Sequence, residues 1–122
     1  MSQAHVLIAH GSPDPDWAVP LQRVVARVRE LDPEATVELA LLTDEGSLEA
    51  ALTRLAERGH TRVEIHAALL SGGGKHLKRD IPAWVQAARE AFPALELVLR
   101  PGALGERDRV IDALARAALD TD

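Results

Sequence analysis

The feature that most constrains the fold is a regular alternation of short apolar runs with stretches of helical apolar spacing. Four apolar runs occur along the chain, and each is followed by a segment whose apolar residues recur every three or four positions. The runs fit buried strands and the spaced segments fit amphipathic helices. Four strand–helix units in succession predict an α/β fold with a parallel sheet, right-handed crossovers and helices on both faces.

Turn and cap residues place the boundaries of these elements. We expect strands at 5–9, 36–42, 62–70 and 95–99. A helix is expected to begin near Pro20, because proline is tolerated in a first helical turn. Ser47 and Asp80 are expected to be the N-caps of the next two helices. The segment Arg100-Pro101-Gly102 is expected to break the chain before a final helix that contains Val110.

The chain is expected to be one domain, residues 1–122, because no linker or low-complexity tract divides it. A flavodoxin-like, doubly wound sheet with the strand order 2-1-3-4 is the arrangement we predict. In such sheets ligands bind beyond the C-terminal ends of the strands, where the winding direction reverses. That position lies between the first and third strands.

Composition excludes several functional classes. The absence of cysteine rules out disulfides and thiolate metal sites, so a transition metal must be held by nitrogen or oxygen ligands. A net charge of −5 and only three aromatic residues argue against nucleic-acid binding. No apolar run approaches the roughly 20 residues of a membrane-spanning helix. Since the N-terminus also lacks a signal-peptide pattern, we expect a soluble, cytoplasmic protein with no membrane partner.

A glycine-rich segment after the third expected strand has the composition of a ligand-binding loop. Three consecutive glycines, 72–74, precede Lys75 and His76, and Lys78 and Arg79 follow. Glycine offers no side chain for a core, but it allows a ligand to approach the backbone closely. The cations stand out in an acidic chain, so the loop is predicted to bind an anion.

His10 and His76 are predicted to bind a metal ion together. His10 ends the first strand and His76 follows the third, so both loops reach the same crevice in the predicted strand order. Imidazole suits divalent cobalt, nickel, iron and zinc, and it also accepts protons near neutral pH. The remaining histidines carry no such prediction: His66 is expected to be a satisfied core or interface residue, and His5 and His60 are expected at the surface.

Two segments resemble a known family over nearly the whole chain. Ala-His-Gly-Ser-Pro-Asp-Pro-Asp-Trp-Ala (9–18) and Gly-Gly-Gly-Lys-His-Leu-Lys-Arg-Asp-Ile-Pro (72–82) are similar to the small CbiX-type sirohydrochlorin chelatases, which are class II tetrapyrrole chelatases. The resemblance implies a half-size chelatase that dimerises and inserts a divalent metal into sirohydrochlorin or a related anionic tetrapyrrole. Cobalt is the first choice of metal, with iron or nickel as alternatives.

The resemblance also implies roles for individual residues. His10 and His76 are the implied metal ligands and proton acceptors. The substrate carboxylates are expected to contact Ser12, Gly72, Gly73, Gly74, Lys75, Lys78 and Arg79. The metal is a substrate, and no organic cofactor is expected.

Two other functions compete with this interpretation. Relatives often carry a glutamate near the end of the second strand, where this chain has Leu42; a metal or tetrapyrrole carrier without turnover is therefore the alternative. Phosphoryl chemistry is the weaker candidate. Ala9 replaces the arginine of a histidine-phosphatase motif, and His76 replaces the Ser/Thr of a P-loop.

Overall fold

A four-stranded parallel sheet forms the centre of the computed structural model, which describes residues 3–71 and 79–120. The strands are β1 (Ala4–Ala9), β2 (Thr36–Leu41), β3 (Arg62–Ala67) and β4 (Glu96–Ala103). Their order is β2-β1-β3-β4, so β1 pairs with β2 on one side and with β3 on the other. The predicted α/β class and the order 2-1-3-4 are both confirmed.

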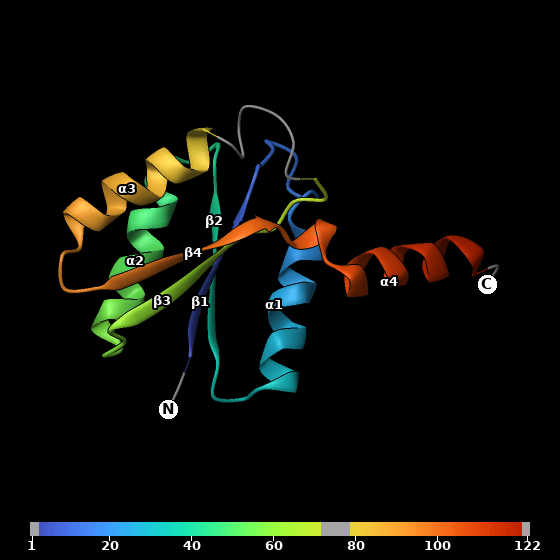
Figure 1. The fold of residues 1–122 in the computed structure, drawn as a ribbon, viewed down its shortest axis with the longest axis horizontal. Helices are drawn as coiled ribbons and strands as arrows, with labels where there is room; N and C mark the ends of the chain where they lie inside the picture. The colour runs from blue at the N-terminus through green and yellow to red at the C-terminus, as the bar shows by residue number, and fades with distance from the viewer. Residues whose placement is uncertain (1–2, 72–78, 121–122) are drawn as a thin grey trace.

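Helices cover both faces of the sheet (Figure 1). They are α1 (Val19–Leu31), α2 (Ser47–Glu57), α3 (Ile81–Ala91) and α4 (Asp108–Leu119), and a short 3₁₀ helix, η2 (Leu104–Glu106), precedes the last. Helices α2 and α3 lie on one face, α1 lies on the other, and α4 projects away from the body. None of the helices in the described part of the chain is long and apolar enough to cross a bilayer.

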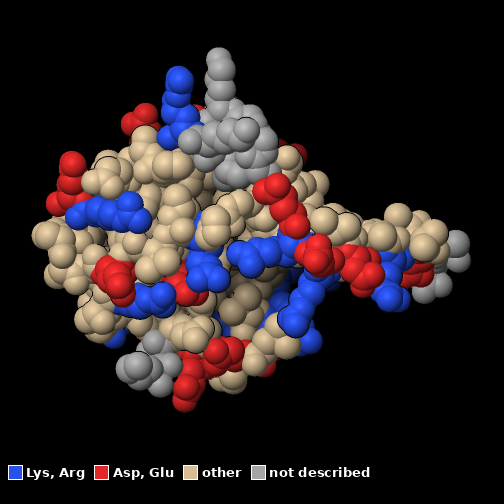
Figure 2. Space-filling model, in the orientation of Figure 1, with Lys and Arg blue, Asp and Glu red and all other residues tan. Residues whose placement is uncertain are grey.

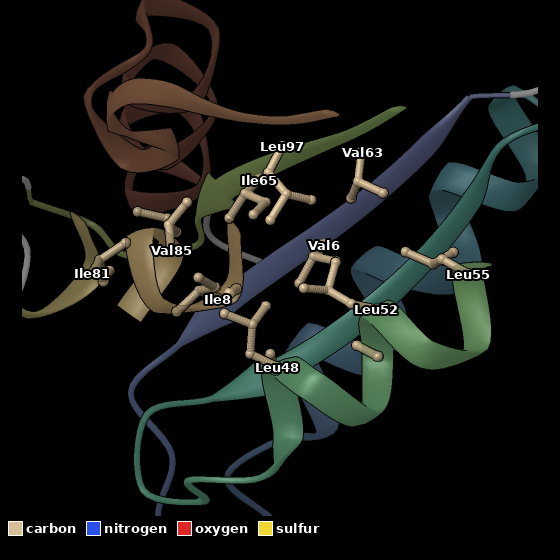
Figure 3. Close-up of a cluster of buried hydrophobic side chains, with 14 of the residues drawn as sticks. Val6, Ile8, Leu48, Leu52, Leu55, Val63, Ile65, Ile81, Val85 and Leu97 are labelled. Atoms are coloured by element: carbon tan, nitrogen blue, oxygen red, sulfur yellow. The ribbon is translucent and has the colours of Figure 1, made fainter. Parts of the chain in front are cut away.

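The hydrophobic core lies between the sheet and helices α2 and α3 (Figure 3). Val6 and Ile8 of β1 are fully buried in it, as are Leu48 and Leu52 of α2 and Val85 of α3. Side chains alternate between the two faces of a strand, so His5 and Leu7 point to the opposite face. The core therefore fixes which β1 residues face away from α2 and α3.

Strand β4 continues through the segment that we expected to break it. Ile65 pairs with Leu99 and Ala67 with Ala103, so three residues of β4 (100–102) lie opposite one residue of β3. This bulge accommodates Pro101, which has no N–H to donate, because β4 is the edge strand of the sheet. The prediction of a break there was wrong, and β3 is shorter than expected, ending at Ala67.

Neither expected N-cap residue caps a helix through its side chain. Ser47 is the first residue of α2, after the N-cap Gly46, and its hydroxyl accepts a hydrogen bond from Leu41 N–H at 2.8 Å. It therefore ties the end of β2 to the start of α2. Asp80 holds the N-cap position of α3, but it has helical backbone angles and makes no side-chain cap hydrogen bond. An N-cap usually has extended backbone angles, which direct its side chain toward the helix N–H groups.

Candidate functional site

His10 lies at the C-terminal edge of the sheet, directly after β1. Its carbonyl oxygen accepts a hydrogen bond from Thr43 N–H at 3.0 Å, and the Ala9 carbonyl accepts one from Leu42 N–H at 2.9 Å. These bonds hold the His10 backbone against the end of β2. The residue itself is exposed, so its side chain is accessible from solvent.

One hydrogen bond defines the protonation pattern of the His10 ring. Nδ1 lies 3.1 Å from the carbonyl oxygen of Gly11. A carbonyl oxygen only accepts, so Nδ1 must donate, and the neutral ring then has its lone pair on Nε2. Histidines that bind metals are oriented in the same way, by a hydrogen bond from the second ring nitrogen to a backbone carbonyl or a carboxylate. In this tautomer Nε2 is the ring nitrogen whose lone pair can bind a metal.

Gly11 permits this arrangement. Its φ angle is 97°, in the left-handed region that L side chains rarely adopt. A Cβ atom at this position would also overlap the Thr43 hydroxyl. The glycine after His10 is thus required by the close approach of β1 and β2 at their C-terminal ends.

A cavity of about 640 Å³ opens beside His10. The ends of β1 and β2 form one wall and α3 forms the other. Its lining residues are His10, Leu42, Thr43, Glu45, Asp80, Ala83, Trp84 and Ala87. Apolar surface therefore predominates, with His10 and two carboxylates at the rim, a composition that suits a largely apolar ligand with a polar or cationic centre.

Two further residues predicted to contact substrate lie in the described chain. The hydroxyl of Ser12 accepts a hydrogen bond from Asp14 N–H at 3.1 Å, so Ser12 organises the loop after β1. Arg79 is exposed immediately before α3. The predicted residues His76, Gly72, Gly73, Gly74, Lys75 and Lys78 lie outside the described residues, and their approach to His10 stays a prediction.

The two ends of the glycine-rich segment are nevertheless placed near His10. On the entering side, Ala68 N–H donates to the carbonyl of Ile8 at 2.7 Å, two residues before His10 in β1. On the leaving side, Asp80 lines the same cavity as His10. Ala68 and Asp80, which precede and follow this segment in the sequence, thus both lie at the edge of the sheet where His10 lies.

A second cluster of ionisable side chains, which the sequence did not lead us to predict, lies on the sheet face turned away from α2 and α3. His5 Nδ1 is 3.0 Å from His66 Nε2 and 3.7 Å from Glu64 Oε2. The side chain of His5 is only 17% exposed, so its predicted surface position was wrong. Ligand atoms of these three residues lie within 4.8 Å of one another.

His66 is not the satisfied histidine that we expected. Among the described residues, its Nδ1 is the one buried side-chain nitrogen or oxygen atom without a hydrogen-bond partner. The cluster was missed because its members become neighbours only through strand register, His5 opposite Glu64 and Leu7 opposite His66. The sequence does contain a signal for the cluster. Side chains alternate along a strand, so His5 lies on the opposite face of β1 from the core residues Val6 and Ile8. Glu64 and His66 lie on that same face of the neighbouring strand β3.

The surroundings of His66 favour its neutral form. Burial is the main reason that its pKa falls from 6.5 to about 4, and the charges of His5, Arg100 and Arg107 lower the pKa further. Glu64 raises the pKa but does not offset the other effects. His66 is therefore neutral at pH 7.

This pKa shift predicts that stability declines as the pH falls from 6.5 toward 4. In that range the unfolded chain takes up a proton at residue 66 and the folded chain does not, so acidification favours unfolding. The free energy of unfolding, measured in urea at pH 7 and pH 5, should therefore change less with pH in His66→Gln than in the wild type. His60→Gln controls for the loss of one histidine. An equal pH dependence in the wild type and His66→Gln would contradict the assignment.

Comparisons with known proteins agree with the fold and cover nearly all of the chain. The profile of the CbiX family matches residues 4–121. Among solved structures, a cobalamin (vitamin B12) biosynthesis CbiX protein from Marinobacter aquaeolei VT8 superimposes with a TM-score of 0.79 at 21% sequence identity. The match covers 98% of this chain and 93% of that one. A search of curated protein sequences gives no match. By the extent of the profile match, the chain belongs to the CbiX family.

Proposed function

We propose that this protein inserts a divalent metal ion into sirohydrochlorin or a related anionic tetrapyrrole, with cobalt as the first candidate and iron or nickel as alternatives. The family match over residues 4–121 supports a chelatase, and one structural observation carries the site assignment. His10, oriented by Gly11, stands at the rim of a mostly apolar cavity at the C-terminal edge of the sheet. A tetrapyrrole is a flat apolar ring with a polar centre, which this arrangement suits.

In the proposed reaction, His10 and His76 bind the incoming ion and the macrocycle lies beside it. The metal forms bonds to the ring nitrogens as two pyrrolic N–H groups lose their protons, so one dication enters and two protons leave. An imidazole released from the metal accepts a proton effectively, because its unperturbed pKa lies near neutrality. Holding the ring and the ion in a fixed orientation supplies a further share of the acceleration.

Trp84 is the residue best suited to hold the macrocycle. It is half-buried on α3 and lines the same cavity as His10. Aromatic rings pack favourably in offset-stacked arrangements, which a planar tetrapyrrole also permits. The peripheral carboxylates of the substrate would then reach the cations that flank α3, namely Arg79 and the predicted contacts Lys75 and Lys78.

Relatives often carry a glutamate where this chain has Leu42, and Glu45 is our candidate for the residue that replaces it. Both residues line the His10 cavity, but only Glu45 brings a carboxylate. It follows β2 by four residues and is exposed. A carboxylate there stabilises the approaching dication and the protonated imidazole alike. We therefore assign to Glu45 the electrostatic role of the missing strand-end glutamate.

Dimerisation is the second part of the proposal. Helix α4 buries none of its residues, and Ile111, Leu114 and Leu119 are large exposed apolar side chains on it. Val24 and Leu31 of α1 are also exposed, on the same side of the sheet (Figure 1). Exposed apolar side chains gathered on one side of a protein mark an interaction site when they form a patch. A second copy covering it would build the two-lobed cleft that the resemblance implies.

We expect His10→Ala and His76→Ala each to slow metal insertion by about 10²-fold or more, the usual contribution of a general base. The measurement is the absorbance change of sirohydrochlorin with Co²⁺, Ni²⁺ or Fe²⁺, and His60→Ala is the matched control. Equal rates in all variants would remove the site assignment. Tetrapyrrole binding by the wild type without any absorbance change on adding metal would instead indicate the carrier.

Glu45→Gln should lower the insertion rate about tenfold, the effect of about 1.4 kcal/mol of lost charge stabilisation. Glu49→Gln is the control, because Glu49 is also an exposed glutamate but does not line the cavity. The two variants should differ in rate and not in unfolding free energy. If Glu49→Gln proves as slow as Glu45→Gln, the carboxylate at 45 has no special role.

The wild-type chain should be a dimer by size-exclusion chromatography with light scattering, and Leu114→Glu should be a monomer, because a charge cannot be buried unpaired in an apolar interface. Arg116→Glu introduces the same side chain at another exposed position of α4 and should leave the dimer intact. A monomeric wild type at micromolar concentration, or a dimeric Leu114→Glu, would contradict the proposed interface.

A further inference from the structure

We propose that His5, Glu64 and His66 form a second metal site, which binds a divalent transition-metal ion on the face of the sheet turned away from α2 and α3. His5 is the second residue of β1 and His10 directly follows the strand, five residues further on, so the two sites are separated by about 16 Å along the chain. They also differ in position, since His10 lies at the sheet edge and His5 within the paired region.

The spacing of the ligand atoms fits a coordination polyhedron. Metal–nitrogen and metal–oxygen bonds of about 2.0–2.2 Å at tetrahedral angles place neighbouring ligand atoms about 3.3–3.6 Å apart. His5 Nδ1 lies 3.0 Å from His66 Nε2 and 3.7 Å from Glu64 Oε2, on either side of that range. The three side chains come from two adjacent, fully paired strands, so the backbone already holds them in position.

Either a proton or a metal ion can lie between the two imidazoles. His5 Nε2 lies 3.2 Å from the Gln3 side-chain oxygen, and donating to it leaves the lone pair of His5 on Nδ1. When the proton of His66 is on Nδ1, its lone pair on Nε2 faces that of His5 across 3.0 Å. A shared proton relieves this repulsion in the metal-free protein. A metal ion accepts both lone pairs, and this bond offsets the cost of leaving His66 Nδ1 buried without a partner.

The outer contacts of Glu64 orient its carboxylate. Arg62 and Arg100 approach Oε1, at 3.3 and 3.8 Å, whereas His5 faces Oε2. One oxygen is thus held by cations and the other is directed to the imidazoles, an arrangement typical of outer-shell partners of a metal ligand. Basic and acidic side chains lie interspersed on the face shown in Figure 2, at the base of α4.

Nearby arginines and the type of ligand atom together determine which ions bind to the cluster. Arg100 also lines the cavity above His66, together with Arg107, so a dication there meets positive charge. Mg²⁺ and Ca²⁺ depend on several oxygen ligands, and this cluster supplies one carboxylate. Ions that bond strongly to imidazole nitrogen, such as Zn²⁺, Co²⁺ and Ni²⁺, gain from two histidines. The site is therefore expected to select transition metals.

The ion has a route to the cluster. A cavity of about 530 Å³, bounded by β3, the β4 bulge and the first turn of α4, contains both Glu64 and His66 on its wall. Water entering by this route completes the coordination shell, since the cluster provides three protein ligands. Three protein ligands with water in the fourth position is an established way in which proteins coordinate zinc.

The test uses the double variant His10→Ala/His76→Ala, which lacks both proposed ligands of the insertion site. Any metal that binds to this variant is therefore bound elsewhere. Isothermal titration with Zn²⁺ should give one equivalent per chain, and Co²⁺ should give visible absorption that excess Mg²⁺ does not remove. Adding His66→Gln should weaken binding at least about tenfold, as the loss of even an outer-shell partner does. Adding Glu38→Gln, which alters a strand glutamate paired with Arg54, should leave binding unchanged.

Paramagnetic NMR provides a readout without altering the cluster. In the His10→Ala/His76→Ala chain, Co²⁺ should broaden the amide signals of His5, Glu64 and His66 before those of the sheet edge. No binding in this background, or broadening centred elsewhere, would overturn the proposal. Because insertion is proposed to occur at His10, His66→Gln alone should retain chelatase activity, so the failure of one site is distinguishable from the failure of the other.

Discussion

The parallel pairing of β1 with β2 and β3 is the constraint on which the rest of the molecule depends. β1 pairs with β2 over its whole length and with β3 over residues 4–8, and its inward residues Val6 and Ile8 are fully buried. The pairing brings the ends of three strands to one edge, where the loops that follow them meet. His10 is therefore placed by the sheet itself, and the hydrogen bond from Thr43 to its carbonyl extends the pairing one residue further.

Because β1 is fixed in this way, this one strand positions residues of both candidate metal sites. Its C-terminal end positions His10 beside the cavity next to α3. Its residue His5, which faces away from the core, contacts Glu64 and His66 of the neighbouring strand β3. The first position is open to a large planar ligand. The second is a cluster whose ligand atoms lie within 4.8 Å of one another, a spacing that suits a single metal ion. Strand pairing holds the backbone of His5, Glu64 and His66 in place, and the hydrogen bond to Thr43 fixes the backbone of His10. These side chains therefore start from fixed positions, as a preorganised site requires.

Apolar periodicity was enough to predict the α/β class, because the strands and the helices α2 and α3 each bury an apolar face. The strand order was predicted from the flavodoxin-like type of sheet, because right-handed crossovers alone permit more than one order. Apolar periodicity did not predict the bulge at Pro101, since an edge strand tolerates a proline that a central strand excludes. The role of Ser47 depends on a contact with Leu41 and not on its place in the helix. The position of His10 could be predicted, because it follows an apolar run and precedes a glycine, while its role and that of His76 stay predictions. The contact between His5 and His66 was missed, because it depends on the register of β1 and β3; alternation shows only that both side chains face away from the core.

Anomalous diffraction at the cobalt edge, from crystals grown with Co²⁺, measures most directly whether the incoming ion reaches the edge of the sheet. We expect a peak about 2 Å from the His10 imidazole, with His76 as a second ligand. A structure with cobalt bound only at His5, Glu64 and His66, or with His76 directed away from His10 while Co²⁺ saturates the protein, would contradict it.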